Sequence, residues 1–206
     1  MQDAVATNMK KILVLTCMFI VYTIIVLTCP VITDWDKSII LFVQSKLKNL
    51  PLFIPLLPDC MLYTLMIIFP LGLSSVYFLK KRELLKVIYI CSIPIITFFL
   101  NCIIKPVVSR LRPDESMQLI VHPHSYSYVS SHSLVTMTLY GLIIYYFFKY
   151  NKNNLIKYPV IVLSVLWILF VGLSRVWLGV HYPSDVLGAY LLGFILCTIY
   201  SKIHIL

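Results

Sequence analysis

The segment SRVWLGVHYPSD, Ser174 to Asp185, is the most informative part of the sequence, because it places ionisable residues between two long apolar runs. Ionisable groups at membrane depth are costly unless they have a function. His181 and Asp185 are four residues apart, so a helix with Pro183 in its first turn would place both side chains on one face. A carboxylate beside an imidazole fixes its tautomer and stabilises the cation that forms when the free nitrogen attacks. The stretch therefore predicts half of a nucleophilic site.

The composition indicates a membrane protein. The chain has 206 residues, of which 60% are hydrophobic and 12% are charged, and its mean hydropathy is +0.92. These values lie far outside the range of soluble domains. The formal net charge of +9 first indicates topology, and not nucleic-acid binding, in so apolar a chain. The cysteines lie in apolar segments without a CxxC pair, which favours buried thiols over a metal or disulfide framework.

Long apolar runs predict an all-α fold, an integral membrane bundle of six transmembrane helices that forms a single domain over residues 1–206. The expected spans are residues 12–32, 51–79, 84–104, 132–148, 158–173 and 185–200. We interpret the first run as a retained helix, because it is too long for a signal peptide and no small-residue cleavage site follows it. Residues 34–49 have a loose helical spacing and predict a short helix in the membrane interface.

The basic residues predict an orientation. With both termini in the cytoplasm, ten of the 17 basic residues lie inside: Lys10, Lys11, Lys80, Lys81, Arg82, Lys86, Lys149, Lys152, Lys157 and Lys202. An excess of Lys and Arg marks the cytoplasmic side of a membrane protein. We therefore expect a multi-pass protein of the cytoplasmic membrane, with residues 105–131 and 174–185 on its extracytoplasmic face.

Two segments, taken from the long polar connection of residues 105–131 and the residues just after it, form a candidate phosphate pocket together with Ser174 to Asp185. The connection begins with KPVVSRLRP, which holds Lys105 and Arg112, and ends with YVSSHS, which holds His132. Together with Arg175 these residues supply three cations, and guanidinium groups suit phosphate oxygens. Backbone N–H groups at a helix start would add further donors. His132 would then protonate a leaving oxygen while His181 attacks phosphorus.

These segments resemble the three motifs of the type 2 phosphatidic acid phosphatase (PAP2) superfamily, which includes membrane lipid phosphatases and vanadium haloperoxidases. The motifs KxxxxxxRP, PSGH and SRxxxxxHxxxD are represented here by Lys105, Arg112 and Pro113, by Val129, Ser130, Ser131 and His132, and by Ser174, Arg175, His181 and Asp185. The first and third match in full. The second has Val129 in place of proline and Ser131 in place of glycine.

The resemblance implies a PAP2-like lipid phosphatase that hydrolyses a phosphomonoester or pyrophosphate on a membrane lipid through a phosphohistidine. It implies that His181 is the nucleophile, that Asp185 orients it and that His132 is the general acid. The implied phosphate-binding residues are Lys105, Arg112, Ser130, Ser131 and Arg175. No metal or other cofactor is implied, and the expected partners are a lipid phosphate and the bilayer, without nucleic acid.

The departures in the second motif have one physical consequence that depends on the backbone. A phosphate contact through the N–H of Ser131 survives the change of side chain. If the replaced glycine required a positive φ, serine would cost about 1 kcal/mol at that position. We therefore expect strain at Ser131 in that case, which glycine would relieve.

Other residues and other functions remain as alternatives. We interpret Asp59, His122, His124, Arg110 and Lys37 as surface or interfacial groups outside the site. A phosphoryl or head-group transferase of the same fold would share the phosphohistidine, and a lipid A phosphatase would share the whole mechanism. A transporter or channel is disfavoured, because the ionisable residues lie at one face. An inactive relative is suggested by the altered second motif, and the oligomeric state stays open.

Overall fold

The structure is a computed structural model that describes residues 2–58, 68, 71–72, 75–76, 79–80, 82–121 and 125–202. This part of the chain is all-α, as predicted, and has no strand. Its helices are α1 (Gln2–Thr28), α2 (Pro30–Leu47), α3 (Phe53–Leu56), α5 (Leu84–Val108), α6 (Ser131–Tyr150), α7 (Asn154–Trp177) and α8 (Pro183–Tyr200), with one 3-10 turn, η1 (Glu115–Met117).

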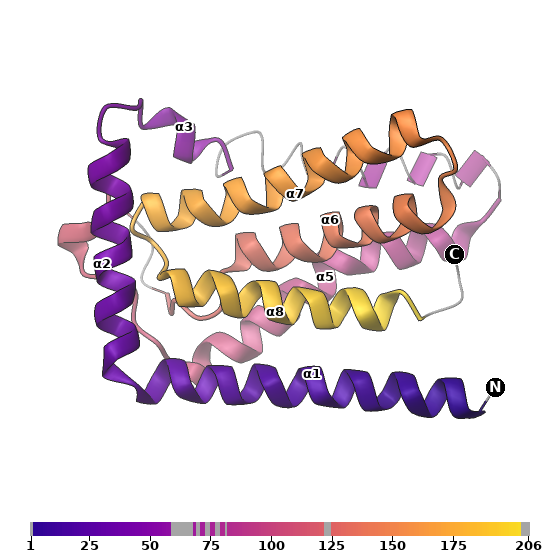
Figure 1. Ribbon diagram of the computed structural model, residues 1–206, viewed down its shortest axis with the longest axis horizontal. Helices are drawn as coiled ribbons and strands as arrows, with labels where there is room; N and C mark the ends of the chain where they lie inside the picture. The colour runs from indigo at the N-terminus through magenta and orange to yellow at the C-terminus, as the bar shows by residue number, and fades with distance from the viewer. Residues whose placement is uncertain are drawn as a thin grey trace.

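Five of these helices are long and apolar enough to cross a membrane: Met9–Thr28, Val87–Val108, Ser131–Tyr150, Asn154–Trp177 and Pro183–Tyr200. They run side by side in Figure 1, and both termini lie at the end of the bundle away from α2. The chain is therefore a multi-pass membrane protein. About half of the predicted span 51–79 lies outside the described residues. Asp59, His122 and His124 lie outside them as well.

The first helix ends earlier than predicted. The span was expected to run to residue 32, but α1 ends at Thr28 and α2 begins at Pro30. Proline suits the first turn of a helix, where its missing N–H has no partner to lose. The new helix α2 occupies the region where an interfacial helix was predicted, and it crosses the ends of the bundle helices (Figure 1). Helix α2 therefore covers the end of the bundle where α1 stops and α8 begins.

Two other helix ends bring predicted site residues into regular structure. Helix α5 continues to Val108, beyond the predicted end at residue 104, so Lys105 lies in its last turn. Helix α7 continues to Trp177, beyond residue 173, so Arg175 also lies in a last turn and not in the connection. Each cation lies at the C-terminal end of its helix, where the macrodipole favours positive charge.

The connection from α7 to α8 is a tight turn that requires a glycine. Gly179 has φ +69°, and a Cβ at this position would lie 2.0 Å from the carbonyl oxygen of Met117. The amide of Leu119 donates to the carbonyl of Leu178 over 2.9 Å, so the segment around η1 is bonded to this turn. The turn leads directly to His181 and to the start of α8 at Pro183.

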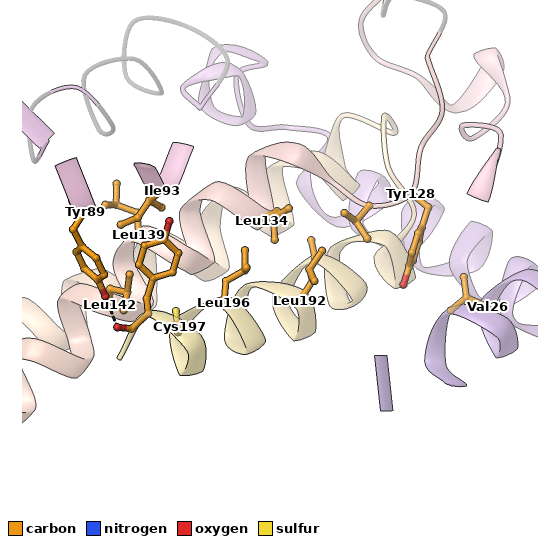
Figure 2. Close-up of a cluster of buried hydrophobic side chains, with 13 residues drawn as sticks. Val26, Tyr89, Ile93, Tyr128, Leu134, Leu139, Leu142, Leu192, Leu196 and Cys197 are labelled. Atoms are coloured by element: carbon orange, nitrogen blue, oxygen red, sulfur yellow. Dashed lines mark hydrogen bonds between the residues drawn. The ribbon is translucent and has the colours of Figure 1, made fainter. Parts of the chain in front are cut away.

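The core of the bundle lies between α5, α6 and α8 and reaches the loop before α6. Figure 2 shows side chains of these helices packed together, with Tyr128 toward one end of the cluster. Tyr128 is fully buried against Gly188, where a Cβ would approach its hydroxyl to 2.6 Å. The missing side chain of Gly188 lets the loop before α6 pack closely against α8. Of the cysteines predicted to be buried, Cys197 is buried, but Cys17 and Cys102 are exposed.

Candidate active site

The candidate site lies at the end of the bundle that α2 crosses. The segment before α6 is bonded to two other parts of it. The amide of Ser127 donates to the carbonyl of Arg110 over 2.7 Å, and the amide of Ser130 donates to the carbonyl of Asp185 over 3.4 Å. The long polar connection and the start of α8 therefore meet, although more than fifty residues separate Ser127 from Asp185 in sequence.

His181 and Asp185 form the centre of the site, and a serine lies between them. Both side chains are buried, with 3% and 0% of their surface exposed. Nδ1 of His181 is 3.6 Å from Oδ2 of Asp185, which is longer than a direct hydrogen bond. The hydroxyl of Ser127 is 3.2 Å from the same Nδ1 and donates to the same Oδ2. Ser127 was not predicted as a site residue from the sequence, although it lies only two residues before the second motif.

These contacts assign the tautomer of His181. The Ser127 hydroxyl donates its hydrogen to Asp185, so a lone pair of the Ser127 oxygen is left to accept the Nδ1–H of His181. The other ring nitrogen, Nε2, lies 3.4 Å from Nη1 of Arg112, which is a donor only. The lone pair of the imidazole is therefore on Nε2 and points toward a cation.

The surroundings of His181 favour its neutral form. Burial holds the pKa of His181 below its usual range, although Asp185 acts in the opposite direction and Arg112 adds to the lowering. A neutral imidazole retains the lone pair that a nucleophile needs.

Arg112 is held in place beside Nε2 by oxygens of two loops. Nη1 donates to the carbonyl of Val180 over 2.5 Å, and Nε donates to the carbonyl of Ser125 over 2.9 Å. Nη2 bonds the Ser125 hydroxyl over 2.9 Å. Burial lowers the pKa of Arg112, Asp185 opposes that effect, and the positive charge of Arg175 contributes to the lowering. Arg112 and Arg175 are therefore close enough for their charges to interact.

The other two predicted cations lie at the ends of α5 and α7. Nζ of Lys105 donates to the carbonyl of Tyr126 over 3.0 Å. Arg175 is completely buried, and its Nη2 donates to the carbonyl of Pro55 over 3.2 Å. A buried guanidinium is costly unless it is paired. Arg175 therefore brings a fixed positive charge into the end of the bundle.

The second motif forms the start of α6. Ser130 is its N-cap, and its buried hydroxyl accepts from the amide of Ser133 and lies 3.0 Å from the Ser133 hydroxyl. Ser131 and the half-buried His132 are the first two residues of the helix. Among the described residues other than glycine, only Arg82 and Ser109 have a positive φ. The condition for strain at Ser131, a positive φ, is therefore not met, because this position has right-handed helical backbone.

The interpretation of Arg110 as a surface residue is also wrong. Its side chain is only 8% exposed, and its Nη1 lies 2.5 Å from Oδ1 of Asp185. Its Nη2 lies 2.8 Å from Oδ2 of Asp36, a residue of α2 that was not predicted to belong to the site. Lys37 does lie at the surface, where it pairs with Asp114 over 2.9 Å. The residue types alone did not indicate which cation would be buried.

No cluster of three or more His, Cys, Asp or Glu side chains suited to a metal ion occurs in the described part of the chain. The carboxylate oxygens of Asp185 and Asp36 accept hydrogen bonds from Arg110, Ser127 and Ser184.

The fold and site define a multi-pass helical membrane protein with a buried histidine that faces arginine at one end of its bundle. The chain belongs to the PAP2 superfamily, whose family model matches residues 86–205. That range includes all three motifs.

Individual relatives agree with this family. The chain is 39% identical over 101 residues to phosphatidylglycerophosphatase B of Bacillus subtilis (strain 168), which is 47% of each chain. It is 30% identical over 127 residues to the bacitracin transport permease protein BcrC of Bacillus licheniformis, or 57% of this chain and 56% of the relative. The matched regions thus span about half the length of these curated relatives.

A solved structure matches much more of the chain. The crystal structure of a transmembrane PAP2-type phosphatidylglycerolphosphate phosphatase from Bacillus subtilis superposes with a TM-score of 0.70 at 26% identity. The match covers 93% of this chain and 94% of that chain.

Proposed function

We propose that this protein is a lipid phosphatase that hydrolyses a phosphomonoester or pyrophosphate on a membrane lipid through a phosphohistidine. One observation carries the proposal: Nε2 of the buried His181 lies 3.4 Å from Nη1 of Arg112, while its Nδ1 faces Ser127 and Asp185. This arrangement points the lone pair of the nucleophile to the place where a phosphoryl group would meet a guanidinium.

In the first step, Nε2 of His181 attacks phosphorus and the bond from phosphorus to the lipid oxygen breaks. His132, at the start of α6, gives its proton to the leaving oxygen, so the lipid alcohol or monophosphate departs neutral at that atom. The ring of His181 then carries a positive charge, which Asp185 stabilises through the contacts at Nδ1.

In the second step, water attacks the phosphohistidine and gives a proton to His132, which acts as the base in reverse. The bond from Nε2 to phosphorus breaks, and inorganic phosphate leaves with the neutral imidazole restored. Lys105, Arg112 and Arg175 would stabilise the charge on the transferring phosphoryl oxygens, with Ser130 and the amides of Ser131 and its neighbours at the start of α6.

A lipid substrate is supported by an apolar groove next to the site. The groove lies between α1 and α5, has a volume of about 240 Å³, and is lined by residues that include Ile104, Val108 and Tyr128. Ile104 and Val108 are close to Lys105 in the last turns of α5. Each buried methylene of an acyl or isoprenoid tail would contribute about 0.8 kcal/mol to binding.

The names of the relatives support phosphatidylglycerophosphate as the first substrate to test. We place the site on the extracytoplasmic face of the cytoplasmic membrane, because ten of the 17 basic residues belong to segments at the other end. We also propose that residues 1–206 act as a single domain.

The proposal is tested by phosphate release from the purified protein in proteoliposomes. Phosphatidylglycerophosphate, phosphatidic acid, undecaprenyl pyrophosphate and a lipid A phosphate would be compared as substrates. His181→Ala and Asp185→Asn should each lower turnover, the first by at least about 10³-fold, because the nucleophile is lost. Wild-type rates in a His181→Ala preparation free of host phosphatase would reject the mechanism. Product analysis with added lipid alcohols would reveal a transferase.

A further inference from the structure

The carboxylate of Asp185 is bound on both of its oxygens. Oδ2 accepts from the Ser127 hydroxyl and, over 2.9 Å, from the amide of Tyr182. Oδ1 accepts from Nη1 of Arg110 over 2.5 Å. Ser127 and Tyr182 hold the oxygen that faces His181, so Arg110 is the residue that holds the opposite oxygen.

Arg110 itself is held on several sides. Its Nη2 bonds Oδ2 of Asp36 over 2.8 Å, and its Nη1 also bonds the Ser184 hydroxyl over 2.7 Å. The ring of Tyr182 lies 4.3 Å from its Cζ, which adds a cation–π contact. The guanidinium is thus a planar group fixed between two carboxylates, a geometry that lysine cannot reproduce.

Asp36 belongs to α2 and is itself bound to the start of α8. Its Oδ1 accepts from the amide of Ser184 over 2.9 Å, and its Oδ2 accepts from the Ser184 hydroxyl. Only 3% of Asp36 is exposed. Farther along α2, Gln44 donates to the carbonyls of Met117 and Trp177 over 2.8 and 3.0 Å. Helix α2 is therefore bonded to the site-bearing segments at two places.

A purely structural role explains this cluster poorly. Two buried carboxylates and one guanidinium carry a large desolvation cost, and such groups are often replaceable by apolar residues without loss of stability. The cluster also ends on the carboxylate beside the histidine, and not elsewhere in the bundle. These features favour a role in the reaction.

We propose that Arg110 is a positioning residue that fixes Asp185 toward His181, and that Asp36 makes α2 part of the active site by holding Arg110. This inference rests on the proposed phosphohistidine mechanism. During the reaction the ring of His181 gains a positive charge, and Asp185 must stay ionised and face Nδ1. Arg110 on Oδ1 prevents the carboxylate from rotating or taking up a proton. Its effect should therefore fall on the chemical step and not on lipid binding.

The test compares Arg110→Gln, Arg110→Lys and Asp36→Asn with the control Lys37→Gln. Lys37 lies on α2 beside Asp36, is exposed, and pairs with Asp114 outside the cluster, so its substitution removes a cation without touching Arg110. Arg110→Gln should lower kcat by at least about 30-fold with KM within about threefold of wild type. Arg110→Lys should recover only part of the loss, and Asp36→Asn should lower kcat by about tenfold. The double variant Arg110→Gln with Asp36→Asn should lose no more than Arg110→Gln alone.

Several results would overturn the inference. One is a wild-type kcat in any folded Arg110 variant; another is an effect on KM alone, and a third is full additivity in the double variant. Thermal unfolding in detergent identifies the folded variants, and Asp36→Asn, which keeps the size and shape of the side chain, serves if Arg110→Gln does not fold. Wild-type protein and His181→Ala are assayed in parallel. An active wild type with an inactive His181→Ala supports the mechanism, so that a failure in the Arg110 series then concerns the positioning role alone.

Discussion

The hydroxyl of Ser127 lies 3.2 Å from Nδ1 of His181 and is nearer to that nitrogen than Oδ2 of Asp185, which lies at 3.6 Å. The hydroxyl of Ser127 donates a hydrogen bond to Asp185. The orientation of the imidazole therefore depends on a serine as well as on a carboxylate.

Removal of this hydroxyl should slow the reaction. In Ser127→Ala, the buried Nδ1–H loses its nearest acceptor, and an unsatisfied buried group costs about 1–3 kcal/mol. We expect kcat to fall about 10- to 100-fold, since each 1.4 kcal/mol is about tenfold in rate. Ser38→Ala, which removes an exposed hydroxyl of α2, should match wild type. A Ser127→Ala enzyme with wild-type kcat would show that Asp185 orients His181 without help.

The protonation state of His181 gives a prediction about pH. Because burial lowers its pKa, the ring should remain neutral as the pH falls through 6.5, where an exposed histidine becomes protonated. The protein labelled with ¹⁵N-histidine should show one ring with its proton on Nδ1 at pH 6.5 and still at pH 5.5. The signal is assigned by its loss in His181→Gln. A His181 ring that is half protonated near pH 6.5, or that carries its proton on Nε2, would contradict this assignment.

The cations of the site lead to a prediction about metals. Lys105, Arg112 and Arg175 would occupy the role that magnesium has in other phosphoryl-transfer enzymes. Phosphate release should be unchanged in EDTA and should be inhibited by vanadate. Arg112→Met should weaken vanadate inhibition, because the guanidinium lies beside Nε2. Loss of activity in EDTA that Mg²⁺ restores would reject these three residues as the phosphate clamp.

Substitution of Ser131 should have little effect. The residue has right-handed helical backbone in the first turn of α6, so glycine would relieve no strain and would keep the amide. We expect Ser131→Gly to retain kcat within about twofold of wild type, with a slightly lower melting temperature from the greater flexibility of glycine. A large fall in kcat without loss of stability would mean that the Ser131 hydroxyl takes part.

The orientation in the membrane is testable with exposed positions at the two ends of the bundle. Glu115, in η1, and Leu155, at the start of α7, are both exposed. Single cysteines at these positions, in a background without the native cysteines, would be treated with a membrane-impermeant maleimide on intact cells. Glu115→Cys should react and Leu155→Cys should not, because the distribution of basic residues predicts that the start of α7 lies on the cytoplasmic side. The opposite pattern would reverse the proposed face.

The class of the protein could be predicted from its amino-acid pattern alone. Apolar runs of about 20 residues in an apolar chain indicate membrane helices, because backbone groups in lipid must be satisfied within a helix. The four-residue spacing of His181 and Asp185, with Pro183 between them, predicted that the two residues lie together where α8 begins. Asp185 lies in the first turn of α8, and His181 lies in the turn two residues before Pro183. Local signals were insufficient at Pro30, where hydropathy predicted a continuous span although proline begins a new helix.

The contacts that hold the site together arise from the packing of segments that are distant in sequence. The contacts of Asp185 join it to Ser127 and Arg110, which lie 58 and 75 residues away, and Asp36 is 74 residues from Arg110. The charge of Arg110 and its neighbours in sequence resemble those of a surface residue. Its burial became favourable only when α2 and α8 brought two carboxylates to it. Such pairing depends on the packing of distant helices, so no local sequence pattern encodes it.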